Sequence, residues 1–299
     1  MELVRITKLQ GVSKNIVMYS YKRSDYDHIN DHEKKRLRHS ISSLRENNSE
    51  VPIYLFSDNP DMFSKTFDAW YDVNILPFSK NFDPKIPSSW SIHRWYNLSA
   101  FSEDTRILYV DSDTIFPSNV SYIFDTYTSR DIYGKEERGF RHCSITGSSK
   151  NIRNSLDHVD ACIRESGGKI DVYKYCCGVL LLNNGLHLKI NFRLNELTSL
   201  MYELAEGELP YPLPNSRIAD QYAIWVLLSR MSVNCGLFGV QDVTHSFLES
   251  KHEEYFNPIV LHYTTRDEQK FAQSDNKYSD LIRETEGTQG REIDPYSVI

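Results

Sequence analysis

The sequence predicts an α/β fold in which a mostly parallel sheet carries helices on both faces. Two observations lead to this prediction. Short apolar runs alternate with charged stretches of helical periodicity in the first half of the chain, and turn residues close the apolar runs. In sheets of this type, ligands bind beyond the carboxyl ends of the strands. The polar residues that follow the predicted strands are therefore candidates for a functional site.

The first half of the chain supplies four of the predicted strands. They cover residues 15–20, 51–56, 70–78 and 106–110. Residues 31–47 form the first predicted helix, because apolar residues such as Leu37 and Ile41 recur there at helical spacing. A second helix begins at the N-cap candidates Ser89 or Ser91 and ends before the fourth strand.

The second half is less regular, and its elements are shorter or richer in proline. Strands are expected at residues 131–134, 175–182 and 258–262, and a helix at 186–206. The three prolines of residues 209–214 exclude a helix there, so a further helix starts after the caps Asn215 or Ser216. Residues 266–299 are mostly polar and predict a surface helix followed by a loose end.

Composition excludes several classes of protein. The 299 residues include 34 Lys and Arg against 41 Asp and Glu, which gives a net charge of −7. This balance argues against a nucleic-acid binder and against a polybasic membrane anchor. No apolar run approaches the roughly 20 residues that span a bilayer. The N-terminus lacks a signal-peptide core, and the five cysteines form no CxxC pair. We therefore expect a cytoplasmic protein with reduced thiols.

The strongest chemical signal is the pair Asp111 and Asp113, which directly follows the strand of residues 106–110. Side chains two residues apart on an extended chain face the same way, whereas Ser112 between them faces the opposite way. Two carboxylates at a strand end suit Mg²⁺ or Mn²⁺ completed by substrate phosphates. The alternative is an acidic pair that caps the next segment. Asp25 and Asp27 share this spacing but lie in a polar stretch with no strand immediately before it, which favours a solvated loop.

Residues 106–116 resemble the DxD segment of nucleotide-sugar glycosyltransferases with the GT-A fold. The likeness is greatest to family 8, the group similar to glycogenin and to the lipopolysaccharide galactosyltransferases. In that group the aspartates bind Mn²⁺, which holds the diphosphate of the donor. No linker in the sequence separates two autonomous domains, so we expect a single domain over residues 1–299. Its nucleotide-sugar half would span residues 10–125, and its acceptor half residues 126–265.

Further segments match this family in the expected order along the chain. They are His93-Arg94, residues 175–183, Asp220-Gln221 and His262 with the strand before it. The resemblance implies that His262 is the third protein ligand of the metal and that Asp220 and Gln221 reach the donor sugar as catalytic residues. It also places Arg94, Ser112 and Gly178 near the donor. Imidazole nitrogen suits Mn²⁺ better than Mg²⁺, which prefers oxygen.

The chain also departs from the family pattern. Cys176 and Cys177 stand where the family has Asn and a small residue, so contacts to the sugar differ. The Gly and Lys-Pro-Trp that follow the histidine in the family are missing, and Arg266 or Lys270 is the candidate cation for the diphosphate. Tyr19, Tyr21 and Asp58 are candidate donor-binding residues on the basis of their position alone. They lie at the first two strand ends, where the base and ribose would bind.

Together these features predict a metal-dependent hexosyltransferase that moves a sugar from a UDP-sugar to an unspecified carbohydrate, lipid-linked or protein acceptor, with retention. An inverting enzyme would need a base, for which Asp220 is the candidate. Each residue also has a plainer interpretation. His262, Tyr19 and Tyr21 are alternatively core residues, Asp220 complements a helix dipole, and Arg94 pairs with an acid on a helix surface.

Two other functions remain open at this point. A phosphatase of the haloacid dehalogenase type also has an apolar strand followed by D-x-D-x-[TV], which Asp111 to Thr114 matches. In it, Asp111 would be the nucleophile and Asp113 the acid-base. Three predicted strands precede the motif here, and Asp242 is a poor substitute for the later acidic motif. The third alternative is a non-catalytic nucleotide-sugar binder, which the departures at Cys176 and Cys177 leave open.

Overall fold

The computed structural model describes residues 9, 14–22, 27–47, 50–63, 72–78, 89–136, 161, 164, 175–206, 219–245 and 258–262. Within these residues a seven-stranded sheet has the order β3-β2-β1-β4-β7-β6-β8, and a three-stranded sheet has the order β5-β10-β9. The strands are β1 (Asn15–Tyr21), β2 (Ile53–Ser57), β3 (Val73–Pro77), β4 (Arg106–Val110), β5 (Thr114–Ile115), β6 (Ile132–Glu136), β7 (Tyr175–Leu182), β8 (Cys235–Leu237), β9 (Val243–His245) and β10 (Val260–His262).

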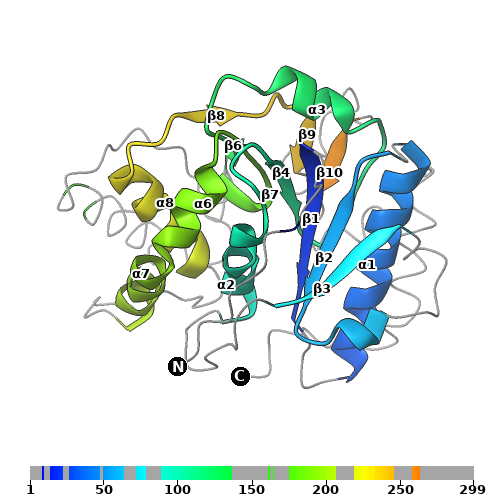
Figure 1. Ribbon diagram of the computed structural model, residues 1–299, viewed down its shortest axis with the longest axis horizontal. Coiled ribbons are helices and arrows are strands. Elements are labelled where there is room, and N and C mark those ends of the chain that lie inside the picture. The colour runs from blue at the N-terminus through cyan, green and yellow to red at the C-terminus, as the bar shows by residue number, and fades with distance from the viewer. Residues whose placement is uncertain are drawn as a thin grey trace, which may run out of the picture.

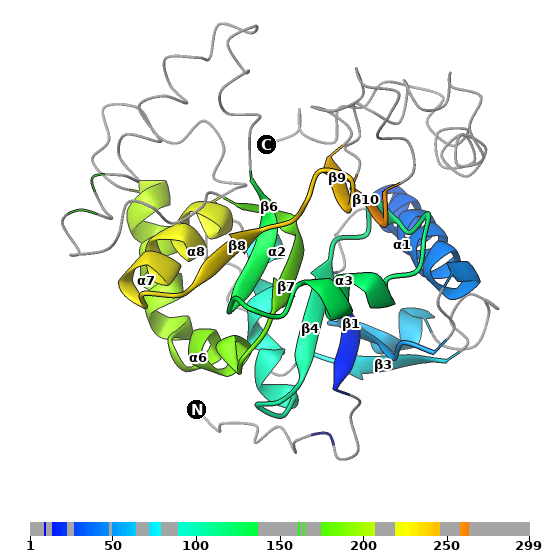
Figure 2. The ribbon, with the colours of Figure 1, turned by 90° about the horizontal axis from the view of Figure 1, so that it is seen from above.

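Helices cover both faces of the larger sheet, as Figure 1 shows. The α-helices are α1 (Asp27–Asn47), α2 (Ser89–Tyr96), α3 (Ser121–Thr126), α6 (Leu186–Phe192), α7 (Leu194–Glu206) and α8 (Ala219–Arg230), with 3₁₀ turns at η1 (Pro60–Phe63) and η3 (Leu98–Ala100). One face packs on α1 and α3, and the other packs on α2, α6, α7 and α8 (Figure 2). The predicted α/β layering with helices on both faces is therefore confirmed.

The two cores follow from the alternation of side chains along the strands. In β1, Val17 and Tyr19 face the helix α1, whereas Ile16 and Met18 face the opposite core. All eight residues of β7 are buried, because this strand lies between β4 and β6 with helices on both faces. The centre of the sheet is thus packed on both faces, and the residues that follow its strands are attached to this core.

Strand direction changes in the middle of the sheet. The strands β3, β2, β1 and β4 are parallel to one another, but β7 runs antiparallel to both β4 and β6. The carboxyl end of β4 therefore lies beside the start of β7. The two strand segments that carry the predicted donor residues meet at this edge.

Several boundaries differ from the sequence expectations. The third strand begins at Val73, although its predicted first residues lie outside the described part of the chain. The helix predicted over residues 186–206 is broken at Arg193 into α6 and α7. Asp27 begins α1, so only part of the loop expected around it precedes the helix. Residues 209–214 and 266–299 lie outside the described residues. The proposed division into two halves stays a prediction.

Candidate metal and donor site

Asp111 and Asp113 lie on the turn between β4 and β5. The backbone N–H of Asp111 donates to the carbonyl of Gly178 on β7, at 2.8 Å. The hydroxyl of Thr114 donates to the carbonyl of Asp111, also at 2.8 Å, and closes the turn. The two carboxylates are therefore attached through their backbone to the centre of the sheet, and their separation depends on a short hydrogen-bonded turn.

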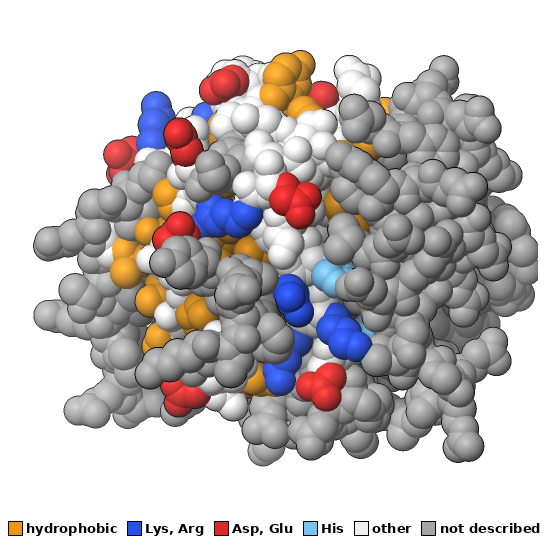
Figure 3. Space-filling view, turned by 90° about the vertical axis from the view of Figure 1, so that its right-hand side faces the viewer, with side chains coloured by type: hydrophobic (Ala, Val, Ile, Leu, Met, Phe, Trp, Pro, Cys, Tyr) orange, Lys and Arg blue, Asp and Glu red, His pale blue; other side chains and the backbone are white. Residues whose placement is uncertain are grey.

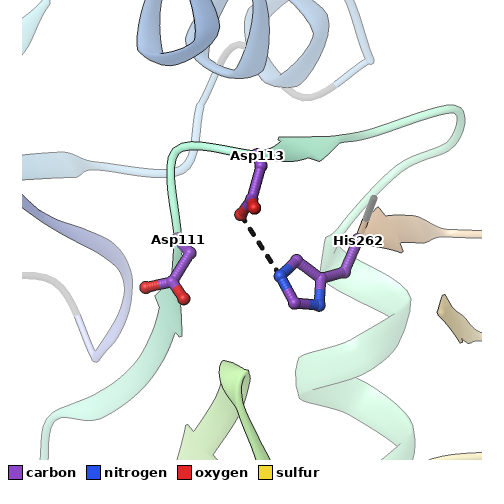
Figure 4. A group of neighbouring side chains, drawn as sticks. All are labelled: Asp111, Asp113 and His262. Atoms are coloured by element: carbon purple, nitrogen blue, oxygen red, sulfur yellow. Dashed lines mark ion pairs between the residues drawn. The ribbon is translucent and has the colours of Figure 1, made fainter. Parts of the chain in front are cut away.

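His262 reaches the same place from the end of β10. This strand pairs antiparallel with β5, and His262 stands directly opposite Thr114. Its Nε2 atom lies 3.2 Å from Oδ1 of Asp113. One ligand atom from each of Asp111, Asp113 and His262 lies within 4.8 Å of the others, and Figure 4 shows Asp113 facing His262 with Asp111 at the start of the same turn.

The donor set of this cluster fits a divalent cation. Two carboxylates and an imidazole are ligands that Mn²⁺ accepts, and the soft imidazole favours it over Mg²⁺. Oδ1 of Asp113 is buried, and its contact among the described residues is the ion pair with Nε2 of His262 at 3.2 Å, so it faces a position where a cation would be compensated. No other group of three such side chains forms in the described part of the chain. Asp111, Asp113 and His262 are thus the residues that would hold the ion.

Without a cation, Asp113 and His262 neutralise each other. Burial would lower the pKa of His262, but the charge of Asp113 and the neighbouring Cys176 outweigh it and hold this pKa well above 6.5. Burial would raise the pKa of Asp113, but His262 and Arg36 outweigh it and hold this pKa below its ordinary value. In the metal-free protein the two side chains therefore form an imidazolium–carboxylate ion pair.

Positive charge also reaches this cluster from α1. Arg36 faces the site closely enough to lower the pKa of Asp113. The same helix carries Lys34, Lys35 and Arg38, and Figure 3 shows Lys and Arg side chains gathered with His on the side of the molecule where α1 lies. Lys34 and Arg36 are themselves paired with Asp31 and Glu33 of the same helix, so Arg36 is the α1 cation shown to act on the carboxylates.

Arg94 of α2 occupies the interior beside the acids. Its Nη1 donates to the carbonyl of Cys177 at 2.8 Å and lies 3.5 Å from Oδ1 of Asp111. Its Nε lies 3.6 Å from Oδ2 of Asp220, and its guanidinium lies over the ring of Tyr109 at 5.0 Å from the centroid. Arg94 is 6% exposed and pairs with the buried Asp220 and the partly exposed Asp111, and not with an acid on a helix surface. Its contact with the donor stays a prediction.

Tyr109 is a site residue that the sequence interpretation missed. Its hydroxyl donates to Oδ1 of Asp111 at 2.6 Å. Burial, against the opposing effect of Arg94, raises the pKa of Tyr109 well above 10, so the phenol keeps its proton and stays a donor. Tyr109 lies two residues before Asp111 on β4, and the alternation of the strand would have revealed it.

Ser112, between the two aspartates, contacts α1. Its hydroxyl donates to Oε2 of Glu33 on α1 at 2.6 Å, and Oε1 of Glu33 accepts from Arg36 at 2.9 Å. The turn is thereby tied to α1. No local pattern marks Glu33, because its role depends on the packing of α1 beside the turn. Contact of Ser112 with the donor stays a prediction.

Asp220 and Gln221 lie in the first turn of α8 and are both buried. Oε1 of Gln221 accepts the backbone N–H of Cys177 at 3.1 Å. The structure therefore brings this pair against β7, the strand that also carries Gly178. Their approach to a donor sugar stays a prediction, but both side chains belong to the same connected group as Arg94 and Asp111.

Gly178 has no room for a side chain. A Cβ atom at this position would overlap the imidazole ring of His262. Because Gly178 also accepts the N–H of Asp111, its backbone lies against two of the three candidate ligands. Its predicted contact with the donor stays untested, whereas its contact with the ligands is direct.

The remaining predicted donor residues lie farther along the sheet edge. Tyr19 is buried and shares a 2.8 Å hydrogen bond with Ser40, and Tyr21 packs edge-on against Phe63. This packing corresponds to the core alternative for both tyrosines. Asp58 is exposed after β2, and contact with base or ribose stays a prediction for all three. Arg266 and Lys270 lie outside the described residues.

Comparison with solved structures identifies proteins of the same fold. The galactosyltransferase LgtC in complex with donor and acceptor sugar analogs is 13% identical and superposes with a TM-score of 0.53, over 94% of this chain and 98% of that one. An active-site glutamine-to-glutamate mutant of LgtC is 12% identical and superposes with a TM-score of 0.54, over 92% of this chain and 95% of that one. The glycosyltransferase GlyE of Streptococcus pneumoniae is 17% identical and superposes with a TM-score of 0.50, over 90% of this chain and 63% of that one.

No protein-family model matches the sequence, and no curated protein matches it either. Among the described helices, none combines the length and the apolar character needed to cross a bilayer. The comparison by structure covers nearly all of the chain at low identity, so it bears on the fold. The chain has the GT-A fold of these glycosyltransferases.

Proposed function

We propose that the protein is a metal-dependent glycosyltransferase that uses a UDP-sugar as donor, with Mn²⁺ held by Asp111, Asp113 and His262. The observation that supports this most is the cluster itself: three suitable ligands, two from the turn after β4 and one from β10, converge at the carboxyl edge of a GT-A sheet. Ligands bind at this edge in open α/β sheets. LgtC was solved with donor and acceptor sugar analogs, which is consistent with a nucleotide-sugar donor here.

When bound, the cation would act as a Lewis acid that stabilises the negative charge developing on the leaving diphosphate. The chain's own residues supply the rest. Arg36 of α1 adds positive charge beside Asp113. Tyr109 and Arg94 orient the carboxylate of Asp111. Fixed charges of this kind need no rearrangement during the reaction, which is what makes them effective.

Asp220 and Gln221 are proposed to position the donor sugar. Asp220 is 3% exposed, and its charge is already balanced by Arg94 at 3.6 Å. A carboxylate held this way suits the orientation of a hydroxyl better than the removal of a proton. Gln221 uses its carbonyl oxygen on Cys177, which leaves the amide N–H groups for a sugar hydroxyl. This division of roles supports retention, in which the leaving phosphate takes the acceptor proton.

The experiment is turnover of UDP-hexoses with Mn²⁺, Mg²⁺ or EDTA, with release of UDP as the readout. We expect UDP release with Mn²⁺, less with Mg²⁺ and none in EDTA. UDP with Mn²⁺ should also raise the melting temperature through its binding to the folded state, and UDP alone should do much less. A shift with GDP or CMP but not UDP would contradict the choice of nucleotide.

The same preparation tests the two alternatives. Hydrolysis of p-nitrophenyl phosphate, without sugar-nucleotide turnover, would indicate a phosphatase of the haloacid dehalogenase type. The position of Asp242 disfavours that outcome, because it is bound by the hydroxyl of Tyr127 and lies outside the Asp111 cluster. Metal-dependent binding of UDP without turnover of any hexose would indicate a non-catalytic binder.

A further inference from the structure

The imidazole ring of His262 is contacted on three sides by different groups. Its Nε2 faces Asp113 at 3.2 Å, and its Nδ1 lies 3.7 Å from Sγ of Cys176. The backbone of Gly178 lies against the ring so closely that a Cβ there would overlap it. Each ring nitrogen is therefore assigned to one partner, and the carboxylate side is the side of the candidate metal site.

The contact with Nδ1 and the contact with the ring both come from β7. Cys176 and Gly178 are two residues apart on this strand, so they face the same way. Cys177 between them faces the opposite core with Ile92 and Trp95. On this strand the sulfur of Cys176 and the bare backbone of Gly178 therefore lie side by side against the imidazole of His262. Cys177, the second of the two adjacent cysteines, packs in the other core.

We propose that Cys176 is a positioning residue for His262: its sulfur accepts the Nδ1–H of the imidazole and thereby presents Nε2 to the metal. A histidine that binds a metal through one nitrogen donates the other N–H to a partner that fixes the ring and its tautomer. Here that partner is a thiol, which is a weaker acceptor than a carboxylate or an amide. The role rests on the metal site of the proposed function.

A packing role and a positioning role for Cys176 predict opposite orders of Mn²⁺ affinity for the Val and Ser variants. Cys176 is 8% exposed on a buried strand, so Cys176→Val preserves its apolar bulk and suits a strand, but it removes the acceptor. Cys176→Ser keeps an acceptor but buries a hydroxyl. If the residue only packs, Val should be the better substitute by every measure. If it positions His262, Ser should be the better substitute for metal binding even though Val gives the higher melting temperature.

The test measures the affinity for Mn²⁺ alone, by electron paramagnetic resonance of the free ion, with melting curves run in parallel. We expect Cys176→Val to weaken Mn²⁺ binding about 10-fold, as for other partners of metal-ligating histidines, with little loss of melting temperature. Cys176→Ser should show a clearly smaller loss of affinity. Cys235→Val is the matched control, since Cys235 is also a thiol outside any disulfide but lies on β8 at the sheet edge.

A double-mutant cycle ties the effect to the histidine. In a His262→Asn background, Cys176→Val should cause no further loss of Mn²⁺ affinity, because there is no imidazole left to orient. Equal affinities for wild type and Cys176→Val, or an unchanged effect in the His262→Asn background, would overturn the positioning role. Absence of Mn²⁺ binding by the wild-type protein would instead overturn the metal site, so the two failures are distinguishable.

Discussion

His262 and Asp113 face each other at 3.2 Å because β10 pairs with β5, the two-residue strand that follows Asp113. Thr114 is the register partner of His262, so a slip of one residue in this pairing would turn the imidazole to the other face. The small sheet therefore aligns the third ligand with the first two. The turn after β4 and the end of β10, about 150 residues apart in the sequence, therefore depend on each other for the site.

The acidic pair gives the first prediction. Asp113→Asn and Asp111→Asn should each reduce Mn²⁺ affinity by more than the roughly 10- to 100-fold typical of losing a partner of a ligand, because each removes a ligand itself. Turnover of the donor should fall with it. The measurement is a Mn²⁺ titration of UDP release, with circular dichroism to verify folding. Asp125→Asn is the control, since Asp125 is an exposed acid on α3. Near-normal turnover at saturating donor in either variant would show that the site lies elsewhere.

Much of the fold could be predicted because its strands are long enough to show their pattern. The strands β1, β2, β4 and β7 and the helix α2 begin and end close to their predicted limits. The strands β5, β8 and β9 have two or three residues each, which is too short for any periodicity. The antiparallel direction of β7 is also invisible in sequence, because a strand buried on both faces reads the same in either direction.

Some residues of the site could likewise be predicted from the sequence, and others could not. Asp111 and Asp113 are local to one strand end, so the sequence placed them together, and the family resemblance added His262. The contacts of Arg94 with Asp220, of Ser112 with Glu33 and of Cys176 with His262 join distant segments. No periodicity encodes such pairs. The change from Asn to Cys at position 176 looked like a departure from the family, and its contact with the histidine emerged only from the fold.

The pair of Asp113 and His262 makes the stability of the metal-free protein depend on pH. The pKa of His262 is raised well above 6.5, so its contribution is complete below pH 6.5 and is lost as the pH rises through the raised pKa. The pKa of Asp113 is lowered, so its contribution is present above the ordinary value of 3.8 and is lost as the pH falls through the lowered pKa. We expect the melting temperature in EDTA to fall on the alkaline side in wild type and not in His262→Asn.

Mn²⁺ competes with the proton on His262, which gives a separate prediction for binding. Because the imidazolium must lose its proton before it can bind a metal, the affinity for Mn²⁺ should keep rising with pH above 6.5. A Mn²⁺ titration at several pH values measures this, with phosphate-free buffer and no nucleotide present. In His262→Asn the dependence over this range should be nearly flat. An equally steep rise in the variant would remove His262 from the set of ligands.

Arg94 and Asp220 form a buried ion pair whose loss should be costly. Arg94→Met leaves Asp220, which is 3% exposed, without its counter-charge, and breaking a buried pair from one side typically costs about 3–5 kcal/mol. Asp220→Asn added to Arg94→Met should recover part of this loss, because it removes the uncompensated charge. Urea unfolding of the two single variants and the double variant provides the measurement. Strictly additive losses would mean that the two side chains act independently, contrary to their 3.6 Å contact.

Gly178 gives the last prediction, because it separates the metal site from general stability. A methyl group at position 178 would overlap the ring of His262, whereas one at Gly134 would overlap the ring of Tyr175, away from the Asp111 cluster. Both Gly178→Ala and Gly134→Ala should lower the melting temperature, since each forces a buried ring to move. Only Gly178→Ala should also weaken Mn²⁺ binding, because the displaced ring carries a ligand. Melting curves and Mn²⁺ titrations of the two variants test this, and an equal loss of affinity in Gly134→Ala would show that the metal responds to the stability of the sheet and not to the position of His262.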